Sequence, residues 1–226
     1  MSETPPNPEL LRSLGKLVRG LSALFWGLPA ALIVCAGTAF GGWFRAFNVI
    51  PVTVTTGLIC YGLWQIGAFQ KQERPWRIAL DRARLMALIN LGLSPFLFWW
   101  NRMQDNPFFI TMVALFAVTS LLFLFNLNLV IARLGEMIPD ETLRQETRQF
   151  TVINRTLLII VLAIASCLVF LIQMQSLPQD FRELLFRLQR IGQPVLMLLI
   201  LLPLSLTMSL LWKTKEVIME SLVTHR

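Results

Sequence analysis

The longest apolar stretch of the chain covers residues 107–134 and reads PFFITMVALFAVTSLLFLFNLNLVIARL. It contains no Asp, Glu, Lys or His, and its one basic residue, Arg133, stands next to its end. An α-helix rises about 1.5 Å per residue, so about 20 apolar residues are needed to cross a hydrocarbon core of about 30 Å. The stretch therefore predicts a helix that spans a membrane.

Five further stretches resemble it in composition. Together they predict six spans, at about residues 21–44, 46–69, 85–100, 107–134, 154–174 and 194–212. The third is short and carries Asn90, Ser94 and Pro95. Pro75 suits the first turn of a helix, so we expect this helix to begin near Pro75 among the headgroups and then to enter the bilayer. If the third segment does not cross, the orientation of every later segment is inverted.

The overall composition argues against a soluble globular protein. Of the 226 residues, 55% are hydrophobic and 15% are charged, and the mean hydropathy is +0.63. A soluble domain needs about 25% charged residues to cover its surface. We therefore predict an all-α fold in one domain over residues 1–226, a polytopic transmembrane helical bundle of six spans with short interfacial amphipathic helices.

The charge distribution predicts the orientation. The formal charge is +7, from 20 Lys and Arg against 13 Asp and Glu. Because cytoplasmic loops are enriched in Lys and Arg, we predict that both termini lie in the cytoplasm, which assigns three quarters of the basic residues to that side. The same rule explains the basic excess without a nucleic-acid partner. This distribution of basic residues favours an integral protein of a bacterial inner (cytoplasmic) membrane, in contact with the lipid bilayer.

The segment before the first span predicts a leader and an interfacial helix. Residues 1–9 are polar and rich in proline, which is typical of a flexible leader. In residues 10–20, leucines recur at helical spacing opposite Arg12, Lys16 and Arg19. We expect this segment to lie on the cytoplasmic leaflet, with the three basic side chains in contact with lipid headgroups.

Two further segments lie between spans. The connector at residues 135–153 is the most hydrophilic part of the chain, and it is the expected docking surface for a protein partner; the alternative is a solvated helix that links two spans. On the opposite face, the residues after Pro178 have the apolar periodicity of a second amphipathic helix.

The spans lack ionisable groups at their centres. None carries Asp, Glu, Lys, Arg or His there, and such groups mark proton relays, voltage sensors and ion pathways. Uncharged amides remain, and they either join helices by hydrogen bonds or line a cavity. The candidates are Gln65, Asn90, Asn126 and Asn128.

Small residues in the first span predict close helix packing. Gly37 and Gly41 form a GxxxG pattern, which lets two helix backbones approach each other. An intramolecular contact and a homo-oligomer explain this pattern equally well.

The chain lacks the residue clusters that most enzymes and metal sites require. Cys35, Cys60 and Cys167 are isolated among apolar residues, and the single histidine is His225. We therefore expect no metal ligands, no cofactor-binding residues and no catalytic residues, and we do not expect an enzyme.

These features favour a multi-pass membrane protein that acts as a non-catalytic accessory, scaffold or assembly component of a membrane complex. The alternative is a permease or channel-like protein for a neutral or lipidic substrate. The two hypotheses differ in one structural expectation. In a permease the four amides converge on one water-accessible cavity, whereas in a scaffold they pair with neighbouring helices.

Overall fold

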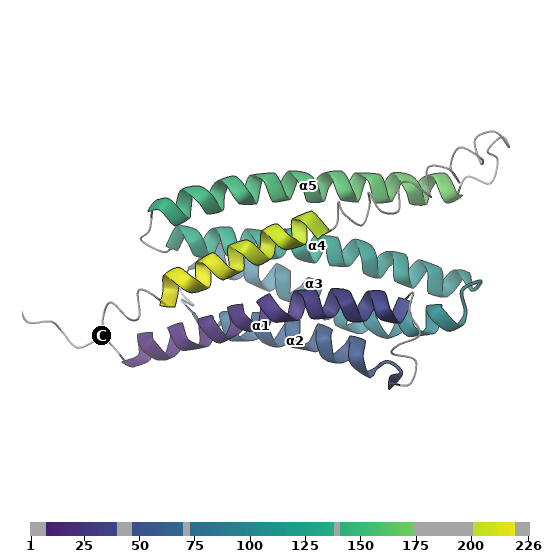
Figure 1. Ribbon diagram of the computed structural model, residues 1–226, viewed down its shortest axis with the longest axis horizontal. Coiled ribbons are helices and arrows are strands. Elements are labelled where there is room, and N and C mark those ends of the chain that lie inside the picture. The colour runs from purple at the N-terminus through teal and green to yellow at the C-terminus, as the bar shows by residue number, and fades with distance from the viewer. Residues whose placement is uncertain (1–7, 40–46, 70–72, 138–140, 174–200, 220–226) are drawn as a thin grey trace, which may run out of the picture.

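The computed structural model describes residues 8–39, 47–69, 73–137, 141–173 and 201–219. These residues form six helices and no strand. The first five helices are α1 (Pro8–Ala39), α2 (Ile50–Ile66), α3 (Arg74–Arg102), α4 (Pro107–Met137) and α5 (Glu141–Gln173). The sixth, called the 201–219 helix below, is yellow in Figure 1. The prediction of an all-helical fold is confirmed for the described part of the chain.

The helices form an elongated bundle with their axes roughly along its length (Figure 1). Contacts join α1 to α2, α2 to α3, α3 to α4 and α4 to α5. The 201–219 helix contacts both the first and the last helix of this series, α1 and α5. Its Trp212 ring lies 5.4 Å from the ring of Phe25 on α1, and its Thr207 hydrogen-bonds to α4 and α5.

Four of the described helices are long and apolar enough to cross a membrane. Their candidate spans are Arg12–Ala39, Arg74–Arg102, Pro107–Met137 and Thr147–Ile164. Helix α2 is also apolar but has 17 residues, which corresponds to about 25 Å. The bundle therefore has the composition of an integral membrane protein.

The third predicted span gains its length from the residues before it. Helix α3 has 29 residues, or about 43 Å, and Pro75 lies in its first turn as the sequence predicts. Two polar side chains in its apolar part, Asn90 and Ser94, are buried in the bundle. The segment is thus long enough to cross despite its short apolar part.

The first helix differs from the expected division into an interfacial helix and a span. Residues 10–20 belong to α1, which continues without a break to Ala39. Leu17, one of the leucines of the segment expected on the leaflet, is 0% exposed and belongs to the bundle core. An apolar stripe fits a protein core as well as a lipid surface, and here the other helices cover it.

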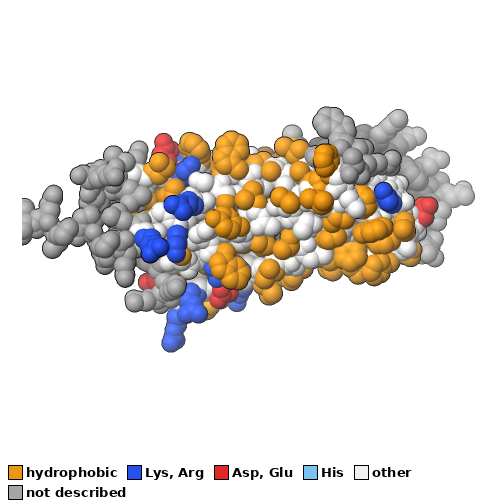
Figure 2. All heavy atoms as spheres, turned by 90° about the horizontal axis from the view of Figure 1, so that it is seen from below, with side chains coloured by type: hydrophobic (Ala, Val, Ile, Leu, Met, Phe, Trp, Pro, Cys, Tyr) orange, Lys and Arg blue, Asp and Glu red, His pale blue; other side chains and the backbone are white. Residues whose placement is uncertain are grey.

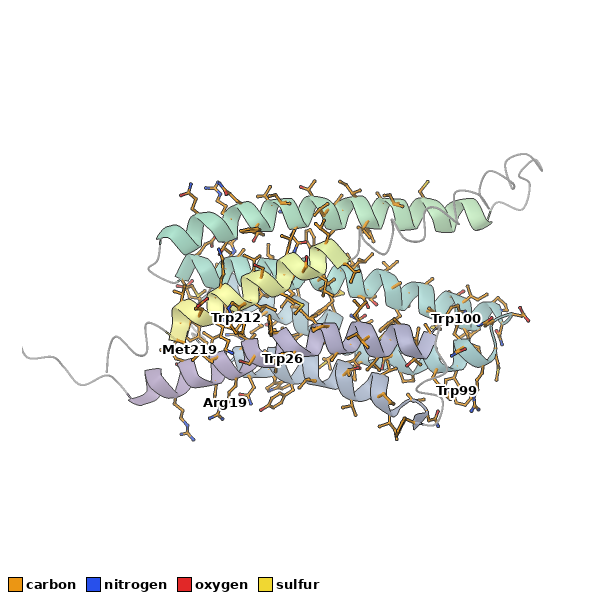
Figure 3. All side chains as sticks on the ribbon, viewed as in Figure 1. Arg19, Trp26, Trp99, Trp100, Trp212 and Met219 are labelled. Atoms are coloured by element: carbon orange, nitrogen blue, oxygen red, sulfur yellow. The ribbon has the colours of Figure 1, made fainter. Side chains whose placement is uncertain are left out.

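The surface of the bundle is divided along its length. Lys and Arg side chains gather toward one end, and apolar side chains cover the middle (Figure 2). Large apolar side chains such as Trp26, Ile33 and Ile50 are about two-thirds exposed. Tryptophans also divide between the two ends, with Trp26 and Trp212 apart from Trp99 and Trp100 (Figure 3). This is the pattern of a bundle whose apolar band faces lipid.

Several predicted features lie outside the described residues. They are most of the leader at 1–9, Gly41, the amphipathic segment after Pro178 and the first part of the span at 194–212. The connector at 135–153 is described in part, and its residues belong to the end of α4 and the start of α5.

Candidate functional site

Three helices meet at a buried polar junction made of Asn128 on α4, Asn154 on α5 and Thr207 on the 201–219 helix. The exposed fractions of these residues are 1%, 0% and 0%. Asn154 Nδ2 donates to Asn128 Oδ1 at 2.8 Å and to Thr207 Oγ1 at 2.9 Å. Asn128 Nδ2 donates to Thr207 Oγ1 at 3.1 Å. We call this set the amide junction.

The amide junction is also tied to the helix backbones. Asn128 Nδ2 donates to the carbonyl of Leu124 at 2.8 Å, and Thr207 Oγ1 donates to that of Pro203 at 2.7 Å. Asn154 lies inside the candidate span Thr147–Ile164. Amides at membrane depth find their partners in neighbouring helices, and this junction fixes the relative rotation of three of them.

One face of α5 carries oxygen atoms without a hydrogen-bond partner among the described residues. They are Thr147 Oγ1, Thr151 Oγ1 and Asn154 Oδ1. The positions are four and three residues apart, so the atoms follow one side of the helix. At the end of this line α4 and α5 approach closely, because a Cβ added at Gly135 would lie 3.2 Å from Thr147 Cγ2.

A second polar contact links α3 to α4 and to α2. Thr119 Oγ1 donates to Asn90 Oδ1 at 2.6 Å, and Thr56 Oγ1 lies 3.4 Å from Ser94 Oγ. Asn90 and Ser94 are four residues apart on α3 and therefore share a face. These buried pairs hold α2, α3 and α4 in register.

A third polar region lies where α2 ends and α3 begins. The guanidinium of Arg84 donates to the carbonyl of Leu63 at 3.3 and 3.4 Å and to that of Trp64 at 3.4 Å. It also pairs with Asp81 at 3.4 Å. Arg84 thus places its positive charge at the negative end of the α2 dipole.

The four predicted amides do not meet at one place. Asn128 lies in the amide junction, and Asn90 pairs with Thr119. Asn126 Nδ2 donates to the carbonyl of Leu122 in its own helix, and Gln65 Nε2 donates to Tyr61 Oη at 2.8 Å. Asn126 and Asn128 point to different sides of α4, as their spacing predicts.

The predicted lipid-contact residues are exposed, whereas the one predicted packing glycine that the structure describes is half-buried. Arg12, Lys16 and Arg19 are exposed on one side of α1. Gly37 is half-buried, and Gly41 lies outside the described residues.

The close approach of α1 and α2 involves glycines that the sequence analysis did not single out. A Cβ at Gly20 would lie 2.6 Å from Ile66 Cγ1 and 2.7 Å from the carbonyl oxygen of Gly62. Gly62 also lies close to the Gly20 backbone, since a Cβ at Gly62 would be 3.1 Å from the Gly20 oxygen.

Two members of the amide junction, Asn154 and Thr207, are not among the four amides predicted from the sequence. Asn154 stands at the predicted start of one span, and Thr207 lies inside another without a distinguishing motif. The helical period of α5 does indicate a buried face that includes Asn154. This face comprises residues 147, 151, 154, 158 and 161, all of which are buried except the half-buried Thr151. Nothing on that face identifies the partner helices.

The described residues offer no cluster of three or more His, Cys, Asp or Glu able to hold a metal ion. Their cysteines, Cys35, Cys60 and Cys167, are free thiols.

Comparisons with known proteins give no relative. No family model, no curated protein and no solved structure matches the chain.

Proposed function

We propose that the chain is a six-span protein of a bacterial inner membrane with both termini in the cytoplasm. Five apolar helices and the largely apolar 201–219 helix support six crossings. The Lys and Arg side chains gathered at one end of the bundle support the orientation, because the inner leaflet and the positive-inside rule favour them there (Figure 2).

Within this topology, the protein acts as a non-catalytic accessory or scaffold component of a membrane complex. The observation that carries this proposal is that buried amides form hydrogen bonds between neighbouring helices. Asn128 and Asn154 bind each other across two helices, and Asn90 binds Thr119 across another pair. A permease needs such groups free to exchange partners with its substrate, whereas a scaffold needs them to hold its helices in a fixed arrangement.

The surface offered to a partner is the first part of α5, within the connector at 135–153. Helix α5 lies on one side of the bundle (Figure 1). Its side chains Arg148, Gln149, Val152 and Ile153 are exposed. Polar and apolar groups alternate around these turns, which suits a protein partner at the membrane surface.

Site-specific photocrosslinking tests this role. A photoreactive residue replaces Gln149 on α5, and in a matched control it replaces Arg82, an exposed residue of α3. We expect one stoichiometric crosslinked partner from position 149 and none from position 82. A monomer without crosslinks that carries a neutral solute into liposomes contradicts the proposal.

One observation favours the alternative, a permease for a neutral substrate. The unpaired oxygens of Thr147, Thr151 and Asn154 follow one side of α5, and a file of water or solute would satisfy them. Cysteines at 147 and 151, compared with one at the buried apolar position Val161, decide between the two. Labelling of 147 and 151 alone by a water-soluble thiol reagent supports the permease, and equal protection of all three supports the scaffold.

A further inference from the structure

A cavity of about 260 Å³ opens at the corner between the end of α2 and the start of α3. We call it the corner cavity. Its lining combines two arginines and one carboxylate with apolar side chains and comprises Gly67, Phe69, Trp76, Arg77, Leu80, Asp81 and Arg84. No residue of the amide junction contributes to it, so it is a separate feature.

Arg84 is held in the corner cavity by weak contacts. Its four hydrogen bonds, to Leu63, Trp64 and Asp81, measure 3.3 to 3.4 Å. Hydrogen bonds of nitrogen to oxygen usually measure about 2.7 to 3.2 Å. The guanidinium also lies over the Trp64 ring, 5.4 Å from its centre. These contacts place the guanidinium in the cavity, and because they are long its donors retain the capacity to bind a stronger acceptor.

Gly67 makes this position of Arg84 possible. A Cβ at Gly67 would overlap Nη2 of Arg84. The helix end therefore has room for a guanidinium only because residue 67 has no side chain. Gly67, directly after α2, and Arg84 on α3 thus together place a cation at this corner.

The cavity lining carries a net positive charge. Arg77, Asp81 and Arg84 are spaced by four and three residues along α3 and share one face. Asp81 pairs with Arg84, and among the described residues Arg77 has no ion-pair partner. Arg77 is also exposed, so its fork of donors is open to an incoming anion. Two guanidinium forks in one cavity are typical of phosphate recognition.

An apolar stripe on α2 leads to the same corner. Its members lie on one face of the helix, are 37% to 68% exposed, and comprise Ile50, Val54, Leu58, Tyr61 and Trp64. The stripe ends at Trp64, the residue that Arg84 stacks on. From residue 50 to residue 64 a helix extends about 21 Å, which exceeds the half-thickness of about 15 Å of a hydrocarbon core.

From this combination we propose that the corner cavity binds the phosphate of an anionic phospholipid, whose acyl chain lies along the α2 stripe. Arg77 supplies the open donors, and Arg84 supplies the fixed charge. Asp81 opposes the phosphate, so it limits the affinity. The stripe distinguishes a lipid from a free phosphate, because only the lipid has a tail to cover it.

Thermal unfolding of the full chain in detergent tests this site, with phosphatidylglycerol as the probe and phosphatidylcholine of the same chains as the control. We expect phosphatidylglycerol to raise the unfolding temperature and phosphatidylcholine to leave it unchanged. Arg77→Gln weakens the binding of phosphatidylglycerol about fivefold. The matched control Arg82→Gln, exposed on the same helix and outside the cavity lining, leaves binding unchanged. Asp81→Asn strengthens it.

Three results overturn the proposal. Equal losses for Arg77→Gln and Arg82→Gln indicate general attraction to a basic surface. Stabilisation by inorganic phosphate alone, with no further effect of lipid, assigns the cavity to a soluble anion. Weaker binding in Asp81→Asn shows that the carboxylate organises the cavity and does not oppose the ligand. Arg77 is exposed, so its variant keeps the unfolding temperature of the unsubstituted protein in the absence of lipid.

Discussion

Replacing Asn128 with leucine removes the α4 contribution to the amide junction and keeps a side chain with the same branching at Cγ. The substitution deletes the bond from Asn154 at 2.8 Å and the bond to Thr207 at 3.1 Å. Hydrogen bonds between helices in a membrane contribute about 0.6 kcal/mol on average and about 1.7 kcal/mol at most. Two such bonds predict a loss of about 1.2 kcal/mol, with an upper limit of about 3.4 kcal/mol.

The matched control is Asn126→Leu, two residues away on the same helix. Its amide donates to the carbonyl of Leu122 within α4, and the described residues give it no bond to another helix. Both variants exchange the same amide for the same apolar side chain, so the difference between them isolates the contacts between helices. We expect a loss within about 0.5 kcal/mol for this control.

The assay is the free energy of unfolding by SDS titration in mixed micelles. A double-mutant cycle with Asn154→Leu extends it, because two residues in direct contact show a coupling energy of about 0.5 to 3 kcal/mol. Equal losses for Asn126→Leu and Asn128→Leu, or independent effects of Asn128→Leu and Asn154→Leu, refute the assignment of the amide junction as a link between helices.

Two further substitutions test the packing by the same titration. Gly20→Ala places a methyl group against Ile66 and the α2 backbone and is expected to cost about 1 to 3 kcal/mol, whereas Gly15→Ala, with nothing within 4 Å of the new Cβ, is expected to cost nothing. A larger effect at Gly15 contradicts the helix contact. Leu127→Ala, at a position 0% exposed, is expected to lower the free energy of unfolding by about 2 to 5 kcal/mol. Leu115→Ala, at a position 46% exposed, is expected to lower it by less than half as much. The reverse order would show that α4 is rotated about its axis.

The helical content could be predicted from the sequence because lipid imposes a strong constraint. A backbone in hydrocarbon must satisfy its own hydrogen bonds, so an apolar stretch of the length of residues 107–134 has few alternatives to a helix. The same reasoning, with Pro75 as a start signal, identified the beginning of α3. Both predictions rest on residues close together in the chain.

The partners of polar residues could not be predicted in the same way. Asn128 contacts Thr207 across 79 positions of sequence, and the contact depends on the rotation of three helices about their axes. Spacing within one helix specifies a face, but it does not specify what covers that face. This also explains residues 10–20, in which Leu17 packs into the bundle core.

The contact between Gly20 and Gly62 could not be predicted, for a related reason. The GxxxG pattern at Gly37 and Gly41 satisfies the requirement for small residues, yet the close approach described in α1 occurs at Gly20, opposite Gly62 on α2. A close approach needs small residues at matching heights on two helices. A pattern within one helix therefore predicts only half of the contact.

Cysteine labelling on the two sides of α4 tests the membrane topology most directly. In a chain without Cys35, Cys60 and Cys167, single cysteines replace Gln104, which is exposed just before α4, and Gln149, which is exposed on α5 near the other end of α4. A membrane-impermeant maleimide added to intact cells is expected to label position 104 and to reach position 149 only after the inner membrane is permeabilised. Labelling of position 149 in intact cells, or equal labelling of both positions before permeabilisation, contradicts a bundle that crosses the membrane with its basic end in the cytoplasm.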